Sequence, residues 1–326
     1  MALLNENKLF KLLRFSGTDD EVNAQWLAER QNGVGGSDVA AIMGLSPWKA
    51  AYTLWAEKTG RVQAEDISGK EAVAMGTELE SDVIEMYKRR NPEARVRVVN
   101  AIAQSIERPW ARASVDGLTS DPELGVGVLE IKTGGSERAW ADGVPMYYRT
   151  QVMHYLSVTG YAFADVAALI GDHGLHYHQE RILRDEEDIA VVNGAVDTFW
   201  NDCVKGGRVP LAVASDSKTV TEVGSPGNDE VMPSVPRELA DLIREYGEAK
   251  AKADAAKKVV DDLAAGIKGM LGQYKGCATD THKVTLSRFE RTSVDGKKLK
   301  ELHPDVYEEC TKTSSSTRFS VKELNN

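Results

Sequence analysis

Apolar residues in the first two thirds of the chain follow the helical period of 3.6 residues in some segments and the strand period of two in others. Helical spacing predicts helices at residues 69–90, 145–158 and 186–204. Alternating or continuous apolar runs predict strands at residues 94–103, 110–116, 126–132, 163–170 and 175–183. Residues 119–125, with Asp, Pro and Gly, are typical of a hairpin turn. The element order predicts an α/β fold with helices against a central sheet.

The composition changes near residue 210, where Ser, Thr, Gly and Pro become frequent. Such a stretch is typical of a linker or a long loop. We therefore expect three parts: a domain at residues 1–209, a linker at 210–234, and an extension at 235–326.

The extension contains a long amphipathic stretch whose apolar residues are separated alternately by three and four positions, the a/d pattern of a coiled coil. These residues are Leu239, Leu242, Tyr246, Ala249, Ala253, Ala256, Val260, Leu263, Ile267 and Met270. The small alanines favour close approach to another helix or to the body of the protein. Gly247, Gly266 and Gly269 interrupt the stretch and cost up to about 1 kcal/mol each relative to Ala, so the helix can break there.

Residues 282–300 follow this stretch and predict a basic hairpin or strand and then a short helix. The basic segment from Lys283 to Lys300 suits docking or DNA contact, although a solvated face is the commoner explanation of such a charge run.

The strongest local signal for chemistry is the motif RASVDG at residues 112–117 followed by LEIK at 129–132. Asp116 and Glu130 lie near the ends of predicted strands that a hairpin can bring together. The two-residue period of a strand sends Glu130 and Lys132 to one face and Ile131 into the core. Two carboxylates, a backbone carbonyl such as that of Ile131, and water suit Mg²⁺, with Mn²⁺ as the alternative. The competing interpretation is an ordinary Asp-Gly turn and a surface Glu–Lys pair.

Composition limits the other classes of function. The chain has 326 residues and a net charge of −10, which argues against a general nucleic-acid coat but not against a local catalytic site. We expect Cys203, Cys277 and Cys310 to be reduced structural thiols, because no metal-ligand spacing connects them. No apolar run approaches the roughly 20 residues of a membrane span, and the start lacks the features of a secretory signal, so a cytoplasmic location is expected.

Several motifs occur in an order that resembles one family. They are WLAER and GVGGSDVAAIMGLSPW within residues 26–48, GTELE at 76–80, the two acidic motifs, and YRTQVMHYL at 148–156. Together they resemble the YqaJ/lambda-exonuclease family of viral recombinases, part of the PD-(D/E)XK nuclease superfamily, over roughly residues 20–205. The resemblance implies a restriction-endonuclease-like fold with a central mixed sheet, and the rest of the chain is similar to the helical tail of longer members.

The resemblance also implies roles for individual residues. Asp116 and Glu130 would be metal ligands, Lys132 the catalytic lysine, and Glu80 an additional acidic residue from the first helix. Gln151 and Tyr155 are four residues apart, so they share a helix face, and they match the family's Gln-x-x-x-Tyr element beside the site. Without the resemblance, Glu80 would be an ordinary exposed glutamate, Gln151 a solvent-facing residue and Tyr155 part of the core.

The Gly-rich turn that ends at Ser37 and Asp38 precedes a helix start, which is a natural phosphate site or a simple N-cap. The resemblance implies that Arg30 and Ser37 bind the terminal 5′ phosphate, and Arg is geometrically suited to phosphate. Lys49 is a weaker candidate nearby.

One residue departs from the family pattern, because Val115 stands where a Pro usually precedes the first catalytic Asp. Pro supplies only backbone stiffness at this point, so activity is still expected. His154 belongs to the helix motif, while His173, His176 and His178 flank a turn without an accompanying acidic pattern, so none is assigned to a metal.

The resemblance implies a Mg²⁺-dependent exonuclease that digests one strand of a DNA duplex from its 5′ end and exposes a 3′ single strand for recombination. It also implies a homotrimeric ring threaded by double-stranded DNA, and a single-strand annealing protein as partner. An endonuclease with the same metal site is the first alternative. A non-catalytic module that binds DNA ends is the second, and it is disfavoured because such a module has no chemical need for Asp116, Glu130 and Lys132 together.

Overall fold

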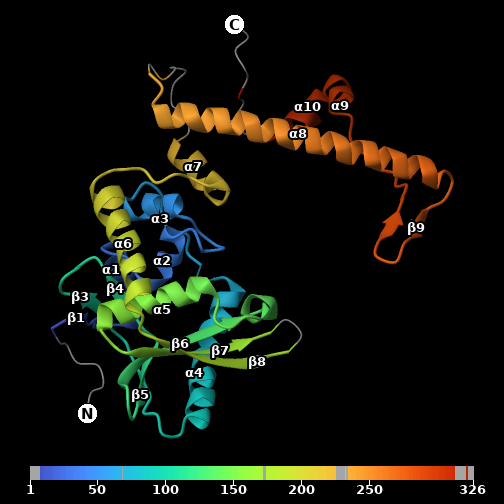
Figure 1. The fold of residues 1–326 in the computed structure, drawn as a ribbon. Coiled ribbons are helices and arrows are strands. Elements are labelled where there is room, and N and C mark those ends of the chain that lie inside the picture. Colours follow the sequence, from blue (N-terminus) through green and yellow to red (C-terminus); the bar gives the residue numbers. More distant parts are fainter. Residues whose placement is uncertain are drawn as a thin grey trace. The chain divides into compact units, whose positions relative to one another are not determined.

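The computed structural model describes residues 8–67, 69–171, 174–224, 232, 234–312 and 321. It contains two compact units, Met1–Ser225 and Pro226–Asn326 (Figure 1). Among the described residues, no helix combines the length and the apolar character that crossing a membrane requires.

The segment 210–224, expected to be linker, belongs to the first unit. It contains the 3₁₀ helix η3 (Ala214–Asp216) and helix α7 (Ser217–Gly224). Asp216 is fully buried, and its carboxylate accepts hydrogen bonds from the amide and the hydroxyl of Thr53, at 3.0 and 2.6 Å. This buried contact holds the segment on helix α3 (Ala51–Lys58). Most of the remaining expected linker lies outside the described residues.

A five-stranded sheet forms the centre of the first unit, in the spatial order β2-β5-β6-β7-β8. Its strands are β2 (Arg97–Val98), β5 (Gly117–Asp121), β6 (Gly125–Gly134), β7 (Phe163–Ile170) and β8 (His176–Leu183). Only β6 and β7 pair in parallel, because helix α5 (Met146–Thr159) connects them as a crossover, and the other pairs are antiparallel. The expected central mixed sheet is confirmed.

Three smaller strands form a second sheet in the order β1-β3-β4. They are β1 (Phe10–Leu13), β3 (Ile102–Ser105) and β4 (Arg112–Ser114). The single strand expected at residues 94–103 is therefore wrong: β2 and β3 lie in different sheets, because the chain leaves the central sheet after Val98. The strand expected at 110–116 is shortened to β4, and the turn expected at 119–125 is narrower, because β5 continues to Asp121.

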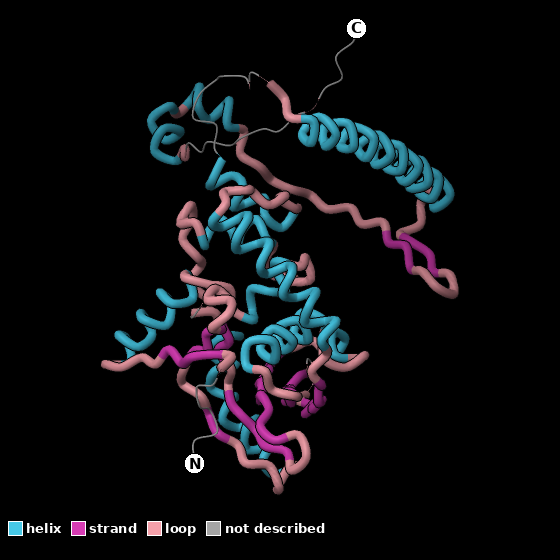
Figure 2. The backbone as a smooth tube through the Cα atoms, turned by 60° about the vertical axis from the view of Figure 1, so that its left-hand side comes forward, coloured by secondary structure: helices cyan, strands magenta, loops and turns pink. Residues whose placement is uncertain are grey.

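Helices cover both faces of the central sheet (Figures 1 and 2). The remaining helices of this unit are α1 (Asp19–Gln31), α2 (Gly36–Ile42), α4 (Glu71–Arg90), the 3₁₀ helix η1 (Glu137–Trp140), α6 (Glu186–Thr198) and the π-helical turn η2 (Phe199–Lys205). Leu129 and Ile131 of β6 pack under α4 with Val83 and Tyr87. Val128 packs in the core of the opposite face, to which α5 contributes. Strand β6 therefore alternates as its sequence predicts, and Glu130 belongs to the α5 face.

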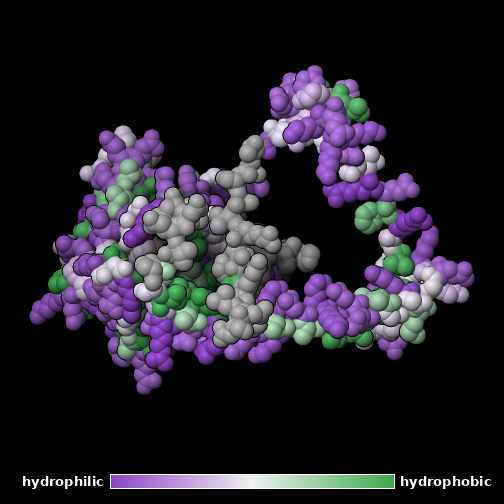
Figure 3. Space-filling view, turned by 90° about the horizontal axis from the view of Figure 1, so that it is seen from above, coloured by the Kyte–Doolittle hydropathy of each residue, from purple (hydrophilic) through white to green (hydrophobic). Residues whose placement is uncertain are grey.

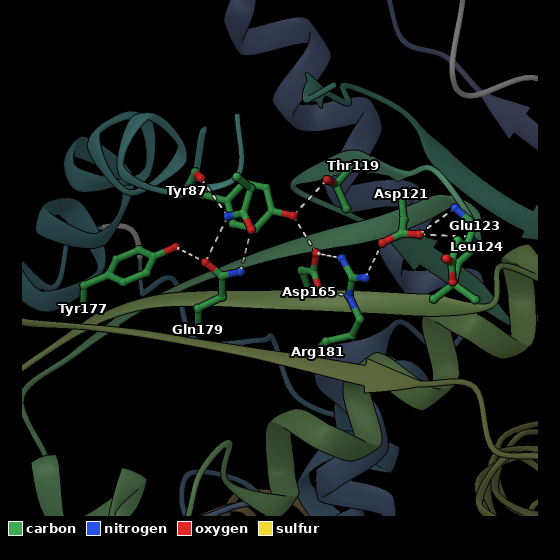
Figure 4. Close-up of polar contacts among 10 residues, drawn as sticks. Tyr87, Thr119, Asp121, Glu123, Leu124, Asp165, Tyr177, Gln179 and Arg181 are labelled. Carbon is green, nitrogen blue, oxygen red and sulfur yellow. Dashed lines mark hydrogen bonds and ion pairs between the residues drawn. The ribbon is translucent and has the colours of Figure 1, made fainter. Parts of the chain in front are cut away.

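A buried polar network fixes α4 on the sheet (Figure 4). Asp165 of β7 is fully buried and accepts hydrogen bonds from the Tyr87 hydroxyl at 2.5 Å and from two guanidinium nitrogens of Arg181 at 2.7 and 2.9 Å. Arg181 also pairs with Asp121 at 2.5 Å. Glu80 lies seven residues before Tyr87, about two helical turns, so both occur on the same side of α4. The network therefore also fixes the position from which α4 presents Glu80.

The second unit begins with α8 (Arg237–Leu271), a single helix of 35 residues that continues through all three glycines, so the helix does not break where a break was considered. Its apolar seam is largely exposed, and Val260 and Leu263 are each 62% exposed. On the face seen in Figure 3, hydrophilic residues predominate and hydrophobic residues form small groups. Residues 282–300 contain a strand and a short helix, as expected, but the partner strand of the hairpin precedes this segment, and residues 286–295 form neither helix nor strand. The elements after α8 are β9 (Gly276–Ala278), β10 (Lys283–Thr285), α9 (Gly296–Leu302) and α10 (Pro304–Cys310).

Candidate functional site

Strand β6 places Glu130 and Lys132 side by side on one face, as the two-residue period predicts. The Lys132 ammonium (Nζ) donates to Glu130 Oε1 at 2.5 Å, and both side chains are largely removed from solvent. Ile131, between them, packs in the opposite core. The Glu–Lys pair is therefore a buried ion pair rather than the solvated surface pair of the competing interpretation.

Asp116 lies at the bend between β4 and β5, beside the same stretch of β6. Its Oδ2 accepts a hydrogen bond from the backbone amide of Ile131 at 2.7 Å. The register explains this contact, because Gly117, the first residue of β5, pairs with Leu129, so Asp116 just before the strand falls opposite Glu130. The two acidic residues, 14 positions apart in the sequence, therefore meet at one end of the β5–β6 hairpin.

Electrostatics in this cluster are strongly perturbed. Burial, reinforced by the charge of Asp116, raises the pKa of Glu130 to about 8. Burial also raises the pKa of Asp116, against the opposing effect of Lys132. For Lys132, burial alone would lower the pKa, but the carboxylates of Glu130 and Asp116 outweigh it and raise the pKa, so the ammonium keeps its proton. Two carboxylates thus share one cation, and a further positive charge would stabilise the site.

Helix α5 covers this cluster with Gln151 and Tyr155. Both are buried, although Gln151 would be expected to face solvent without the family resemblance. The Gln151 amide (Nε2) donates to Glu130 Oε1 at 2.7 Å and to the Tyr155 hydroxyl at 2.9 Å. The ring of Tyr148, on the same helix, lies 4.8 Å from Lys132 Nζ. The helix therefore holds both charged side chains of β6 in fixed positions.

Arg30 of α1 and Ser37 of α2 meet on the other side of the cluster. An Arg30 guanidinium nitrogen donates to Ser37 Oγ at 2.9 Å, and the guanidinium stacks over the Trp26 ring at 4.7 Å. Within the described part of the chain, Arg30 forms no ion pair with a carboxylate. These residues and the acidic cluster line one cavity of about 200 Å³, whose walls comprise Trp26, Arg30, Gly35, Gly36, Ser37, Ile102, Arg112, Ser114, Asp116, Glu130, Lys132, Gln151 and Tyr155.

The start of α2 is capped by Asp38, whose carboxylate accepts from the Gly35 amide at 3.1 Å and pairs with Lys58 at 2.9 Å. Burial would raise the pKa of Asp38, but Lys58 and then Arg30 outweigh it and lower that pKa. The Ser37 hydroxyl is therefore not used as an N-cap. Lys49, the weaker phosphate candidate, pairs with Glu57 at 2.5 Å and does not line the cavity.

Glu80 approaches Asp116 from α4, where burial and then the charge of Asp116 raise the pKa of Glu80. It lines a second cavity of about 350 Å³ that shares Trp26, Ser114 and Asp116 with the first. The structure thus brings Glu80 near the acidic cluster, as the GTELE motif implied.

A divalent cation fits the chemistry of this cluster. Glu130 Oε2 is buried and has no hydrogen-bond donor among the described residues, so one carboxylate oxygen is left for a ligand. The amide of Ile131 points toward Asp116, and in an extended strand the carbonyl of the same residue points to the same side. The described residues contain no group of three His, Cys, Asp or Glu side chains in ligating geometry. A cation here would therefore be held by two carboxylates, a carbonyl and water.

The histidines remain outside this arrangement, as far as they are described. His154 is fully buried, its Nε2 lies 3.0 Å from the carbonyl of Arg112, and burial lowers the pKa of His154 to about 4. His178 lies beside Glu137 and the ring of Trp140. His173 lies outside the described residues.

Sequence reasoning did not assign roles to four residues that contact or line the site: Trp26, Arg112, Ser114 and Tyr148. Arg112 is buried and pairs with the side chain and backbone carbonyl of Glu29, while its Nε has no partner among the described residues. All four belong to motifs that carry the family resemblance. Their position within those motifs was the available signal, because their spacing alone indicates only core residues.

Known proteins of similar sequence place the chain in a family. Two solved exonucleases are similar over slightly more than half of it: an alkaline exonuclease from Laribacter hongkongensis (23% identical, 56% of this chain, 93% of that chain, TM-score 0.46) and a phage-related exonuclease from Haemophilus somnus 129PT (13%, 54%, 96%, 0.41). The sequence model of the YqaJ-like viral recombinase domain matches residues 25–162. The Bacillus subtilis (strain 168) protein YqaJ is 32% identical over 316 residues, covering 92% of this chain and 94% of that protein. The chain therefore belongs to the family of YqaJ-like viral recombinases.

Proposed function

We propose that this protein is a metal-dependent DNA exonuclease that digests one strand of a duplex from its 5′ end and leaves a 3′ single strand. The observation that carries the proposal is the convergence of Asp116, Glu130 and Lys132 in a cavity that also contains Arg30 and Ser37. A structural ion pair alone does not require a second buried carboxylate beside it, because that carboxylate raises the electrostatic free energy of the metal-free site.

Asp116, Glu130 and the Ile131 carbonyl would hold Mg²⁺, with Mn²⁺ as the alternative. The bound cation would supply an activated water and offset negative charge on the scissile phosphate. In this chain, Glu130 Oε2 has no competing donor among the described residues, and the Ile131 amide orients the carboxylate of Asp116.

In this proposal, Lys132 acts as a protonated hydrogen-bond donor rather than as a general base. Its raised pKa keeps the proton on Nζ at neutral pH, so the ammonium can donate to a phosphate oxygen as negative charge develops there. Gln151 holds Glu130 Oε1 at 2.7 Å, and the Tyr148 ring limits where the Lys132 ammonium can move. These contacts keep the reacting groups oriented before the substrate arrives.

Arg30 and Ser37 would bind the terminal 5′ phosphate. Arg30 has no carboxylate partner within the described residues, so its charge is available to an anion, and the Ser37 hydroxyl lies beside it at 2.9 Å. A cavity of about 200 Å³ contains both this pair and the acidic cluster. We infer that the cavity accepts one terminal nucleotide, with its 5′ phosphate at Arg30 and the scissile phosphate at Glu130.

The proposal extends to the oligomeric state of the protein and to its partners. We infer a homotrimeric ring around the duplex, in which topology rather than a uniformly basic surface retains the DNA. We also infer a cytoplasmic protein that acts on double-stranded DNA ends and passes the 3′ strand to a single-strand annealing protein. Static light scattering coupled to gel filtration tests the ring, and a monomer at working concentration would count against it.

The decisive experiment is digestion of linear duplex labelled at either the 5′ or the 3′ end, with and without Mg²⁺ and with and without a 5′ phosphate. We expect mononucleotide release from the 5′ end, dependence on Mg²⁺, and faster digestion of phosphorylated ends. Asp116→Asn should lower the rate at least about a hundredfold, because it removes a charge from the cation site while keeping the side-chain shape.

Asp82→Asn is the matched control, because this exposed carboxylate on α4 lies outside the cavity, and its rate should match wild type. Equal digestion by Asp116→Asn and wild type would refute the catalytic assignment. Cleavage of a covalently closed circular duplex would instead indicate an endonuclease.

A further inference from the structure

Within the second unit, positive charge is concentrated in one segment. Residues 275–300, which we call the basic arm, have a net charge of +4, whereas the whole chain has −10. The basic side chains of the arm are Lys275, Lys283, Arg288, Arg291, Lys297, Lys298 and Lys300. All seven belong to exposed residues.

Ion pairing distinguishes the basic arm from the helix that precedes it. Helix α8 carries seven basic and seven acidic residues, and three of the basic residues form ion pairs along its own surface. Lys250 pairs with Asp254 at 2.7 Å, and Lys257 pairs with Asp261 at 3.0 Å. By contrast, no basic side chain of the arm forms an ion pair with any residue that the structure describes. The positive charge of the arm is therefore available to an anionic ligand.

The basic arm also exposes apolar side chains between its charges. Phe289 is 83% exposed and lies between Arg288 and Arg291, and Val294 is 77% exposed. Residues 286–295 form neither helix nor strand, and Figure 2 shows them as a long extended loop between the hairpin and α9. At full extension these ten residues span roughly 33 Å.

An exposed aromatic ring between cations on an extended backbone matches the chemistry of a nucleic-acid strand with unpaired bases. Lys and Arg neutralise phosphates, and an aromatic ring stacks most readily on bases that are unpaired, as in a single strand. An acidic protein partner would use the same charges but would gain no base stacking from Phe289.

We propose that the basic arm binds single-stranded DNA, with Phe289 as a stacking platform and the flanking arginines as phosphate contacts. The inference rests on the proposed function for the source of the ligand, which would be the 3′ strand left by digestion. Binding itself requires no digestion, so it can be measured separately.

The test is fluorescence anisotropy of labelled dT20 and of a labelled 20-bp duplex with the full chain in EDTA, which prevents metal-dependent digestion. We expect Phe289→Ala to weaken dT20 binding about tenfold, within the range of one stacking contact, and to change duplex binding less than twofold. We expect R288Q/R291Q to weaken dT20 binding at least about tenfold and to reduce the slope of log affinity against log salt by about 1.4.

The matched control is K250Q/K257Q, which also removes two positive charges but takes them from paired lysines on α8. We expect this variant to bind dT20 within twofold of wild type. Unchanged dT20 binding by Phe289→Ala would overturn the proposal. Equal weakening by K250Q/K257Q would also overturn it, because it would indicate a general charge effect. Equal loss of duplex and dT20 binding in R288Q/R291Q would identify a duplex contact instead, and no loss with either ligand would favour an acidic protein partner.

The two proposals can fail separately. If the wild-type protein does not digest duplex DNA in Mg²⁺ but binds dT20 through Phe289, the nuclease assignment fails and the proposal that the basic arm binds single-stranded DNA remains. If duplex digestion requires Asp116 but dT20 binding does not depend on Phe289, the proposal that the basic arm binds single-stranded DNA fails and the nuclease assignment remains.

Discussion

Lys132→Met removes the cation that two buried carboxylates share, so it tests the electrostatic description of the site. Lys132 is 16% exposed and Glu130 2% exposed, and their charged atoms lie 2.5 Å apart. The Met side chain fills a similar volume without charge. In the variant, Glu130 and Asp116 would face each other without the ammonium.

Removing one partner of a buried ion pair costs about 3–5 kcal/mol of unfolding free energy. We expect this loss at pH 8.5 without metal. The loss should shrink toward pH 6, because a carboxyl group whose pKa is raised to about 8 in the folded state can take up a proton and become neutral. Mg²⁺ should restore much of the stability at pH 8.5, since it returns positive charge to the carboxylates, and saturation at 100 times its dissociation constant adds about 2.7 kcal/mol.

Urea unfolding followed by tryptophan fluorescence measures these changes in the first unit alone, because all six tryptophans lie between residues 26 and 200. The nuclease rate should stay at least about a hundredfold below wild type even where Mg²⁺ restores stability, since the ammonium that would stabilise the phosphate is absent.

Lys58→Met is the matched control for this experiment. Lys58 is 6% exposed and pairs with Asp38 at 2.9 Å, outside the acidic cluster. It should lose comparable stability, and Mg²⁺ should stabilise it no more than wild type. Lys132→Met with wild-type stability at pH 8.5 would refute the description of a shared cation. An equal Mg²⁺ rescue of both variants would show that the rescue is not local.

Three further predictions concern single side chains. Gln151→Leu should slow digestion about tenfold, because Glu130 loses the donor at 2.7 Å, and a rate within twofold of wild type would contradict this role. Arg181→Gln should cost about 3 kcal/mol in urea unfolding, because Asp165 is fully buried, and a loss below about 1 kcal/mol would contradict it. For His154, whose pKa of about 4 lies below its unfolded value, stability should be complete above pH 6.5 and fall by about 2 kcal/mol between pH 7 and pH 5. His154→Gln should remove that part of the pH dependence in the same unfolding assay.

The sequence predicted those parts of the site that depend on local periodicity. Glu130 and Lys132 share a strand face because side chains alternate along any strand, and the strand was recognisable from its apolar residues. The meeting of Asp116 with this strand was predictable because a short hairpin separates them in the sequence. Gln151 and Tyr155 share a helix face for the analogous reason.

The errors occurred where the outcome depends on tertiary contacts. The alternation of apolar and polar residues at 94–103 indicates an extended chain, but it does not indicate which sheet each half joins. The sequence therefore predicts one strand where the structure has β2 and β3 in different sheets. The segment that ends at Asp216 has the composition of a linker, and only its hydrogen bonds to Thr53 place it in the first unit. Lys49 lies close to the phosphate motif in sequence, but its ammonium pairs with Glu57, and neither residue lines the cavity.

Net charge was the weakest guide to the proposed function, and the distribution of charge in the structure explains why. A net charge of −10 argued against a general nucleic-acid coat, but it averages over carboxylates that are engaged in ion pairs and over cations that are not. Arg30 lacks a carboxylate partner within the described residues, and the ammonium of Lys132 is fixed beside carboxylates whose charge a divalent ion would offset. Phosphate recognition depends on the few cations that a cavity leaves available, and the potential inside a cavity follows its own lining rather than the sum over the chain. An acidic chain can therefore bind DNA wherever its unpaired cations are gathered.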